Sequence, residues 1–522
     1  MLLLRSLFVL LVLLGPSKMI AQVNFSQIVL SGDSAPGVAD GDFLDFEFPS
    51  INATGDVAFW ASLNTQLETS GIFGPTSGVG SPLGMLAITG ATAPGTGGEV
   101  FDVIFRDDPP AINGSGDVAF GARLLNGECA VFGPTSGAGS PLGLVAIANA
   151  PAPGTDGAEY QFLGSVGSLD DSGGTSFLAI LQTGTGPPVD PSNWAAIFGP
   201  TSGAGSPVDA IAREDTPAPG VDDGSEFDFF FVPVSNASGD VAFLGGLRTG
   251  TGPVVNSSSS QAIFGPTSGP GSPLGPVARE GDAAPGANGA MYAAFFAPAI
   301  NASGDVTFNV LLRTEAETGE FIDAGEAIYG PTAGAGSSLG LIARENTPAP
   351  GLADGAEFAD VSLFPSINAP GTIAFTAALR TGTGPVVNES NDGALFTSVA
   401  GQLRCILREG DQITVTLADN STEERTVGSI ELSQAGLNDA GTMALLLSFT
   451  DGSQGIFTAD VSTASPLLGD VNLDNTVNFF DIAPFIAVLA YQGNQAEADA
   501  NQDGVVDFFD IASFIDILAA AP

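Results

Sequence analysis

Histidine is absent from the 522-residue sequence, and the only lysine, Lys18, lies within the first 21 residues. Without histidine there is no Ser-His-Asp or Cys-His catalytic relay and no histidine-bound metal. Without lysine beyond residue 21 there is no Schiff base and no P-loop. Carboxylate pairs could still support glycoside hydrolysis, but the acidic residues recur in repeats and no unique pair stands out. The sequence therefore favours a non-catalytic protein, with a carboxylate-based glycoside hydrolase as the alternative.

Cysteine, tryptophan and tyrosine are scarce, with 2, 2 and 4 residues against 36 phenylalanines. Sugar-binding surfaces usually stack on exposed Trp or Tyr, so this ratio favours a core packed with Phe. Cys129 and Cys405 lie in distant repeats. We expect two separate buried thiols rather than a disulfide, although export would permit one.

Positive charge is also rare, because residues 22–522 carry 11 arginines against 58 acidic residues, a formal charge of −47. Such a surface repels nucleic acid and anionic membranes and attracts divalent cations. Charged residues nevertheless make up 14% of the chain and apolar residues 44%, which excludes a disordered acidic tail. We expect a folded protein without a nucleic-acid partner.

The only long apolar run lies at the N-terminus, over residues 7–14, after Arg5 and before a Gly-Pro break. This layout is typical of a secretory signal peptide over residues 1–21, and the run is too short to span a bilayer. No later segment predicts membrane insertion. We expect a secreted, extracellular protein that is either released or held at the cell surface by protein contacts.

Three short strings recur along the chain at intervals of about 60–67 residues, and each appears seven times. The first, of the type Ile-Phe-Gly-Pro-Thr-Ser-Gly, has its aromatic residue at Phe73, Phe132, Phe198, Phe264, Tyr329, Phe396 and Phe457. The second, Ile-Asn-x-x-Gly-Asp-Val-Ala-Phe, has its glycine at Gly55, Gly116, Gly173, Gly239, Gly304, Gly371 and Gly441. The third, Val-Ala-Arg-Glu-Gly-Asp-x-Ala-Pro-Gly, ends at Gly37, Gly95, Gly154, Gly220, Gly286 and Gly351, with a degraded copy over 405–411.

Each repeat contains four short strands and no helical period, which is the pattern of a β-meander blade. Seven such blades predict a mainly β protein, a seven-bladed β-propeller over residues 22–462, whose closure leaves no long exposed sheet edge. The chain begins with a fourth-strand string at residues 27–30 and ends on a third strand at 455–459. We therefore expect the N-terminal strand to complete the last blade.

The string over residues 51–59 resembles the turn and strand of TolB-type bacterial propellers, where a Ser-Pro-Asp-Gly turn precedes an apolar strand. This resemblance implies an architecture only, since propellers host many unrelated functions. We expect the repeated asparagines to begin turns by hydrogen-bonding to their own backbone, which is a structural role. In the third repeat Asp170 replaces the asparagine and Gly174 replaces the aspartate, a change that a turn tolerates. These asparagines are Asn52, Asn113, Asn236, Asn301, Asn368 and Asn438.

Two further sets of repeated charges could serve binding. Arginines followed by glutamate recur in the fourth strand, and we expect ion pairs across strands or blades rather than an anion-binding ring; these are Arg213, Arg279, Arg344 and Arg408. The loops from fourth to first strand are acidic and should share one face with the variable loops from second to third strand. Such a face suits a carbohydrate, protein or cation ligand, with solvated acidic loops as the alternative.

The repeat ends before a linker at residues 463–468, and residues 469–522 contain two 12-residue loops that begin 29 residues apart. Alternating carboxylates and amides supply the six to eight oxygens that Ca²⁺ needs, with a backbone carbonyl at position 7 and a carboxylate at position 12. We expect two Ca²⁺ ions. The predicted metal ligands are Asp470, Asn472, Asp474, Thr476, Asn478 and Asp481 in the first loop, and Asp499, Asn501, Asp503, Val505, Asp507 and Asp510 in the second.

This tandem pair of EF-hand-like loops resembles a type I dockerin, which also ends each loop in Asp. The resemblance implies a small α-helical domain that folds with calcium and binds a cohesin-like domain of a scaffold or surface protein; so short a segment also needs metal to fold. Dockerins choose their cohesin through loop positions 10 and 11, often small hydroxylated residues. Here Phe479, Phe480, Phe508 and Phe509 occupy them, which suggests a more apolar partner-binding surface. The near-identical copies would permit docking in two orientations.

These observations favour a secreted, calcium-binding protein whose propeller is a binding module tethered through a dockerin to an extracellular partner. The first alternative is a dockerin-borne enzyme of polysaccharide catabolism. The second is a structural matrix component of a calcium-rich environment, in keeping with the charge of −47.

Overall fold

The computed structural model describes most of the propeller and part of the C-terminal module. The described residues are 23–65, 69–186, 189–201, 207–221, 224–248, 259–315, 321–350, 352, 355–362, 364–382, 387–399, 401–461, 469, 471, 477, 479–491, 498, 500 and 506–520. The signal peptide predicted over residues 1–21 and the linker predicted over 463–468 lie outside the described residues.

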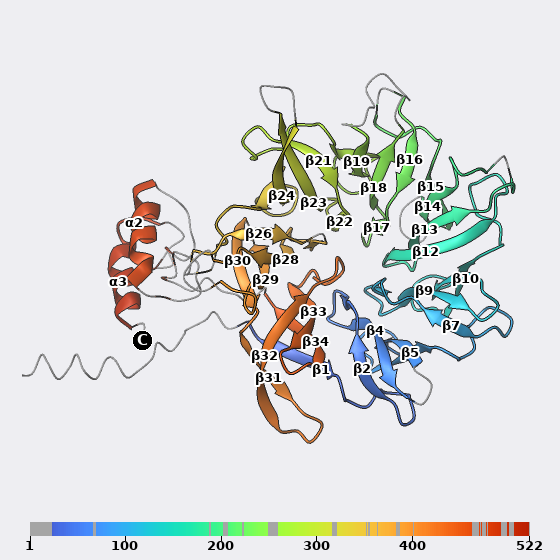
Figure 1. The fold of residues 1–522 in the computed structure, drawn as a ribbon, viewed down its shortest axis with the longest axis horizontal. Coiled ribbons are helices and arrows are strands. Elements are labelled where there is room, and N and C mark those ends of the chain that lie inside the picture. The colour runs from blue at the N-terminus through green and yellow to red at the C-terminus, as the bar shows by residue number, and fades with distance from the viewer. Residues whose placement is uncertain are drawn as a thin grey trace, which may run out of the picture.

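Within the described residues, the strands form seven antiparallel sheets arranged around a central axis, as Figure 1 shows. This arrangement confirms the predicted seven-bladed propeller. The strands of blades 1 to 3 are β2 (Asp42–Phe46), β3 (Ser50–Ile51), β4 (Val57–Asn64), β5 (Thr69–Pro75) and β6 (Leu83–Ile88); β7 (Phe101–Ile104), β8 (Ala111–Ile112), β9 (Val118–Leu124), β10 (Cys129–Pro134) and β11 (Leu142–Ile147); and β12 (Tyr160–Leu169), β13 (Thr175–Leu181), β14 (Ala195–Pro200) and β15 (Val208–Arg213).

Blades 4 to 6 repeat this pattern, and blade 7 joins both ends of the propeller. Their strands are β16 (Phe227–Phe230), β17 (Val234–Ser235), β18 (Val241–Leu247), β19 (Gln261–Pro266) and β20 (Leu274–Arg279); β21 (Met291–Phe295), β22 (Ala299–Ile300), β23 (Val306–Glu315), β24 (Phe321–Pro331) and β25 (Leu339–Arg344); β26 (Phe358–Val361), β27 (Ser366–Ile367), β28 (Ile373–Leu379), β29 (Gly393–Val399) and β30 (Gln402–Arg408); and β31 (Gln412–Thr416), β32 (Thr422–Glu431), β33 (Thr442–Phe449), β34 (Gln454–Asp460) and β1 (Phe25–Leu30).

The first strand of most blades differs from the prediction because it is interrupted. In blade 1, β2 and β3 both pair with β4 and are separated by residues 47–49. Pro49 cannot donate a ladder hydrogen bond, which explains a break at this point. Several acidic residues expected in loops therefore lie on the outer part of the first strand instead; these are Asp42, Asp45, Asp228 and Asp360.

The core of each blade contains the phenylalanines that the composition led us to expect. In blade 1 the rings of Phe59 and Phe73 stack across β4 and β5 with centroids 5.9 Å apart, and Phe43 of β2 meets Phe73 edge-on at 4.8 Å. Blades 2 to 6 repeat the stacked pair, with Tyr329 in place of Phe in blade 5. All these rings are buried, so they contribute both apolar burial and specific ring geometry.

The turn after the first strand does more than reverse the chain, because its asparagine links neighbouring blades. In blade 1, Asn52 Oδ1 accepts hydrogen bonds from the backbone N–H of Thr54 and Asp56, as the sequence predicts. Its Nδ2 donates to the carbonyl of Asn113 in blade 2 at 3.1 Å. The same inter-blade bond recurs from Asn113 to Asp170, Asn236 to Asn301, Asn301 to Asn368, Asn368 to Asn438 and Asn438 to Asn52.

These six bonds form an asparagine ring around the axis that is incomplete only at blade 3. There Asp170 replaces asparagine, so it has no amide group to donate to Asn236. Its Oδ1 still accepts from the N–H of Ser172 and Gly174, whereas its buried Oδ2 has no hydrogen-bond partner within the described structure. The structural role expected for the asparagines is thus observed, with an added role between blades.

Closure of the propeller depends on the N-terminal strand, as predicted. β1 pairs antiparallel with β34, from Phe25 opposite Ala459 to Leu30 opposite Gly455. The side-chain amide of Gln27 also exchanges two 2.8 Å hydrogen bonds with the backbone of Thr416 at the end of β31. The first and last described strands of the propeller are therefore held in one sheet.

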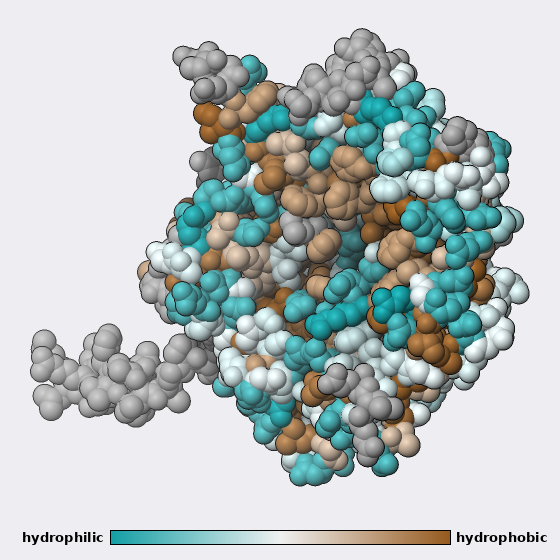
Figure 2. Space-filling model, turned by 45° about the vertical axis from the view of Figure 1, so that its right-hand side comes forward, coloured by the Kyte–Doolittle hydropathy of each residue, from teal (hydrophilic) through white to brown (hydrophobic). Residues whose placement is uncertain are grey.

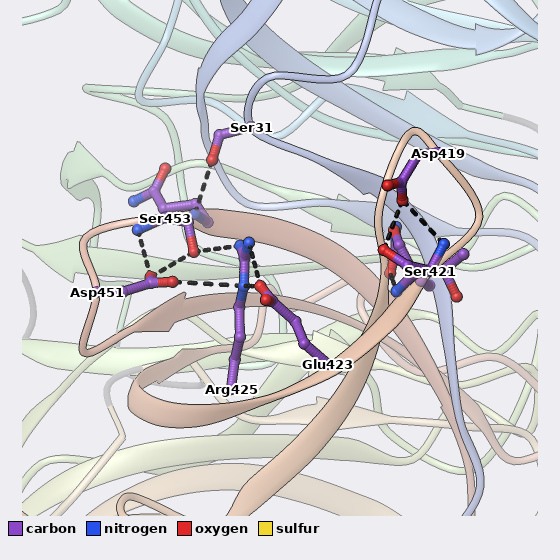
Figure 3. Close-up of polar contacts among 10 residues, drawn as sticks. Ser31, Asp419, Ser421, Glu423, Arg425, Asp451 and Ser453 are labelled. Atoms are coloured by element: carbon purple, nitrogen blue, oxygen red, sulfur yellow. Dashed lines mark hydrogen bonds and ion pairs between the residues drawn. The ribbon is translucent and has the colours of Figure 1, made fainter.

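A polar cluster in blade 7 strengthens this closure (Figure 3). The Arg425 guanidinium of β32 lies 2.7 Å from Glu423 and 3.4 Å from Asp451, and it donates to Ser453 Oγ at 2.6 Å. The adjoining Gln454 N–H donates to Ser31 Oγ, and the Ser31 N–H donates back to the Gln454 carbonyl. The turn before β34 is thereby fixed to the residue that follows β1.

The C-terminal module contains a 3-10 turn, η1 (Phe479–Asp481), and two helices, α2 (Ile482–Tyr491) and α3 (Asp510–Ala520). The rings of Phe485 and Phe514 stack in its core with centroids 3.9 Å apart. These two residues are 29 positions apart, as are the two loops, so the copies contribute equivalent residues to one small core. In the part of the chain that the structure describes, no helix could cross a membrane.

The incomplete ring yields a prediction about stability. We expect Asp170→Asn to raise the unfolding free energy by about 1 kcal/mol, because it supplies the missing donor to Asn236 and removes a buried acceptor without a partner. The reverse change, Asn301→Asp, should lower it by about 1–3 kcal/mol, since it deletes the bond to Asn368. Thermal and denaturant unfolding of both variants measures this. Changes of the same sign in the two variants would contradict it.

Candidate functional site

The described part of the C-terminal module includes the last carboxylate of each predicted calcium loop. Asp481 and Asp510, at position 12, are both fully buried. The Asp507 N–H donates to Asp510 Oδ2 at 2.8 Å, and Asp507 Oδ1 accepts from the N–H of Phe509 at 2.7 Å. The other predicted ligands lie outside the described residues; they are Asp470, Asn472, Asp474, Thr476, Asn478, Asp499, Asn501, Asp503 and Val505.

The charge of the module fits a bound cation. Residues 463–522 contain nine acidic residues and no Arg, Lys or His. Buried carboxylates such as Asp481 and Asp510 need a compensating positive charge or hydrogen bonds, and no basic side chain of the module can supply the charge. A hard cation with oxygen ligands meets this need. Among the described residues alone, potential ligands do not gather in groups of three or more.

The four phenylalanines at loop positions 10 and 11 are exposed. The exposed fractions of Phe479, Phe480, Phe508 and Phe509 are 77%, 73%, 82% and 76%. Ile486 of α2 and Ile515 of α3, again 29 positions apart, are also more than half exposed. Each copy therefore presents the same apolar set, two Phe and one Ile, which we call the Phe-Phe-Ile surface.

On the propeller, the loops from fourth to first strand do share a face with those from second to third strand. The Thr185 hydroxyl in one such loop accepts the N–H of Glu159 in another, and Arg248 at the end of β18 pairs with Asp215 at 2.5 Å. Similar ion pairs join Arg123 to Asp102 and Arg313 to Glu280. The acidic face is thus partly neutralised by arginines of the second strands.

The repeated Arg-Glu pairs of the fourth strands contact the backbone. Arg213, Arg344 and Arg408 donate to the backbone carbonyls of residues 193, 324 and 391, near the start of the preceding strand. The ion pairs expected for these arginines stay a prediction. The glutamate that follows accepts a backbone N–H at the same place, as Glu214 does from Ala195 and Glu409 from Gly393. Burial raises the pKa of both glutamates. These pairs fix the chain near the start of the third strand.

The structure also brings together a carboxyl pair that the sequence did not reveal. Burial, together with the nearby Asp360 carboxyl group, raises the pKa of Glu326 to about 7. Glu326 of blade 5 lies three residues before Tyr329, where blades 4 and 7 have Gln261 and Gln454. Those glutamines accept an N–H from the first strand of the next blade. The pair therefore lies at an inter-blade contact, which gives it a structural role.

Both cysteines are buried and neither forms a disulfide, as expected for residues in distant blades. Cys129 begins β10 and Cys405 lies in β30. Burial raises the pKa of the Cys129 thiol, which further lowers its reactivity.

The central channel contains two cavities. One, of about 210 Å³, is lined by the turns of the asparagine ring. The other, of about 410 Å³, is lined by the segments that interrupt the first strands, and it includes Phe48, Phe231, Phe296, Phe364 and the carboxyl groups of Asp107 and Asp108. Gln434 borders both cavities and donates across the channel to the Pro298 carbonyl at 3.0 Å.

Fold and module together define a seven-bladed propeller protein that carries a dockerin. Residues 468–519 match the model of the type I dockerin domain. The chain belongs to the family of unknown function DUF7453, whose model matches residues 22–464. No curated protein matches the chain.

Solved structures with similar folds include Trypanosoma rangeli sialidase and the uncomplexed Pyrococcus horikoshii acylaminoacyl peptidase. The sialidase is 11% identical over 86% of this chain and 60% of its own, with a TM-score of 0.32. The peptidase is 10% identical over 79% of this chain and 52% of its own, with a TM-score of 0.35. This chain therefore spans less than two thirds of either structure, and similarity of this degree says nothing about its activity.

The raised pKa of Glu326 predicts a pH effect on stability. An acid whose pKa is higher in the folded than in the unfolded state stabilises the fold at low pH, and this contribution is lost as the pH rises through about 7. The melting temperature should thus fall between pH 5 and 8, and Glu326→Gln should reduce that fall. The exposed Glu315→Gln is the control. Equal pH slopes for wild type and Glu326→Gln would contradict the assignment.

Proposed function

We propose that this protein is secreted, binds two Ca²⁺ ions in its C-terminal module, and is tethered through that module to a cohesin-like domain of a scaffold or cell-surface protein. The propeller is the module that the tether positions outside the cell. The observation that supports this most is the exposure of the same Phe-Phe-Ile surface on both copies of a segment that matches the dockerin model.

Calcium would hold the two loops in shape. In each loop the carboxylates and amides at positions 1, 3, 5, 9 and 12 and the carbonyl at position 7 would be its ligands. The burial of Asp481 and Asp510 beside exposed Phe residues supports this role for position 12. When bound, the ion supplies the positive charge that the module otherwise lacks, so that folding of this small unit is coupled to calcium.

The partner surface would be apolar. Four exposed Phe side chains leave a large apolar area in water, and burying such area against a partner is favourable by roughly 25 cal/mol per Å². Exposed aromatic groups of this kind mark interaction sites on monomeric proteins. Type I dockerins bind cohesins, so we propose a cohesin-like domain as the partner. Duplicated surfaces would let either copy dock.

Export follows from the N-terminal sequence and from the tether itself, since a cohesin-bearing scaffold lies outside the cell. The propeller then contributes a rigid body whose variable loops gather on one face. A ligand on that face, carbohydrate or protein, would be carried to the scaffold.

Calcium binding can be measured directly. Titration of calcium into the metal-free mature protein should give two sites, and Asp481→Ala or Asp510→Ala should each remove one, because each deletes the carboxylate at position 12 of one loop. Asp419→Asn, in the turn before β32, is the matched control and should keep both. Two sites retained in both Asp→Ala variants would refute the ligand assignment.

Docking can be tested with the Phe residues. In a calcium-dependent pull-down from envelope and secreted fractions, the double variant Phe508→Ala, Phe509→Ala should still capture a cohesin-bearing protein, because the first copy remains. The same should hold for Phe479→Ala, Phe480→Ala. Changing all four residues should abolish capture. Capture that survives all four changes would place the partner surface elsewhere.

A further inference from the structure

The larger cavity of the central channel is apolar on nearly all sides. Its volume of about 410 Å³ lies in the range of small-molecule sites. The segments that interrupt the first strands line it, and four blades each contribute one Phe, of which Phe231 and Phe364 are 52% and 44% exposed. Figure 2 shows a face that is hollowed near its centre, with both apolar and hydrophilic side chains around the hollow.

Blade 2 departs from this apolar pattern. In blades 1, 4, 5 and 6 a Phe lies one or two residues before a proline, at Phe48, Phe231, Phe296 and Phe364. In blade 2 the corresponding segment reads Asp107-Asp108-Pro109, so two carboxyl groups enter the lining from one side. Asp107 and Asp108 stand where four other blades have an apolar segment, so they are not needed to build the blade, which makes them candidates for binding.

Asp108 lies beside polar and apolar groups of the lining but, among the described residues, beside no cation. Ser165 of β12 lines the cavity next to it, and burial raises the pKa of Asp108. Arg106 is engaged elsewhere: it pairs with Glu47 of blade 1 and lies over the Trp60 ring at 5.6 Å. Among the described residues, no ion pair joins an arginine to Asp107 or Asp108, and none of the residues that line the cavity is basic.

We propose that this cavity binds an organic cation, a primary or quaternary ammonium group attached to an apolar body. The Asp108 carboxylate would hold the ammonium group by a charge-assisted hydrogen bond or close charge contact. The Phe rings would cover the apolar body and attract the cation through their faces. An anion is disfavoured by the carboxylates, and a hard metal ion by the lack of six to eight oxygens in the lining.

The test compares two ligands with the same phenylethyl body, phenethylamine with a charged ammonium group and 2-phenylethanol with a neutral hydroxyl group, by calorimetric titration into the calcium-loaded mature protein. We expect the amine to bind once per chain and the alcohol at least tenfold more weakly. Asp108→Asn keeps the shape of the side chain but removes its charge. It should weaken amine binding about 10- to 100-fold, as expected for loss of a charge-assisted hydrogen bond, and leave the alcohol unchanged.

Asp102→Asn is the matched control, because Asp102 is an exposed residue of β7 in the same blade and does not line the cavity. It should leave amine binding unchanged, whereas Phe231→Ala should weaken both ligands. Melting curves verify that each variant is folded. The proposal is overturned if folded wild type does not bind the amine, if both ligands bind equally, or if Asp102→Asn and Asp108→Asn have equal effects. None of these outcomes bears on the dockerin, so the two proposals fail separately.

Discussion

The amide group of one asparagine in each of six blades is the contact on which the propeller depends most. Its oxygen shapes the inner turn, and its nitrogen reaches the carbonyl of the next blade, at 2.9–3.1 Å around the axis. Asparagine is suited to both tasks because its side chain carries an acceptor and two donors. At positions that are 2–5% exposed, an unmade bond would leave a polar group without water. Blade 3, with Asp170, keeps the turn and loses the link.

A ring held this way tolerates variation away from the axis. The stacked aromatic pairs fix the second and third strands of blades 1 to 6, and the fourth-strand Arg-Glu pairs hold the start of the third strand. The loops between these points can then change in length and charge without disturbing the core. The interruption of the first strand also tolerates different residue types, because its side chains lie in the channel. Four blades place a Phe there and blade 2 places Asp107 and Asp108, so the lining of one cavity is asymmetric.

Much of this architecture could be predicted from the sequence, because repetition is visible without knowing any contact. The seven strings predict seven blades, and their order predicts that β1 completes the last one. Contacts between repeats are harder to predict from the sequence. The partners of Arg213 and Arg344 are backbone carbonyls, which carry no sequence signal, and the approach of Glu326 to Asp360 depends on how adjacent blades pack. The Asp107-Asp108 pair could have been found by aligning the segments before each proline.

In the C-terminal module the predicted metal ligands can be identified from the sequence, but the exposure of the partner-binding residues cannot. Its ligand spacing and duplication are explicit in the sequence, and the dockerin match agrees with them. The exposure of the four loop phenylalanines could not be predicted from the sequence, because large aromatic residues beside a helix usually pack inward. The structure shows that all four side chains are more than 70% exposed. The buried Phe485 and Phe514 meanwhile supply the core, which leaves the loop Phe residues free for a partner.

In the proposed function, the C-terminal module, and not the propeller, attaches this protein to its partner through calcium. Retention of the mature chain, and of a chain that ends at Val461, can be compared on a cohesin-bearing surface in calcium and in EDTA. We expect that only the full mature chain in calcium is retained. Equal retention of the shortened chain, or retention that EDTA does not affect, would contradict it.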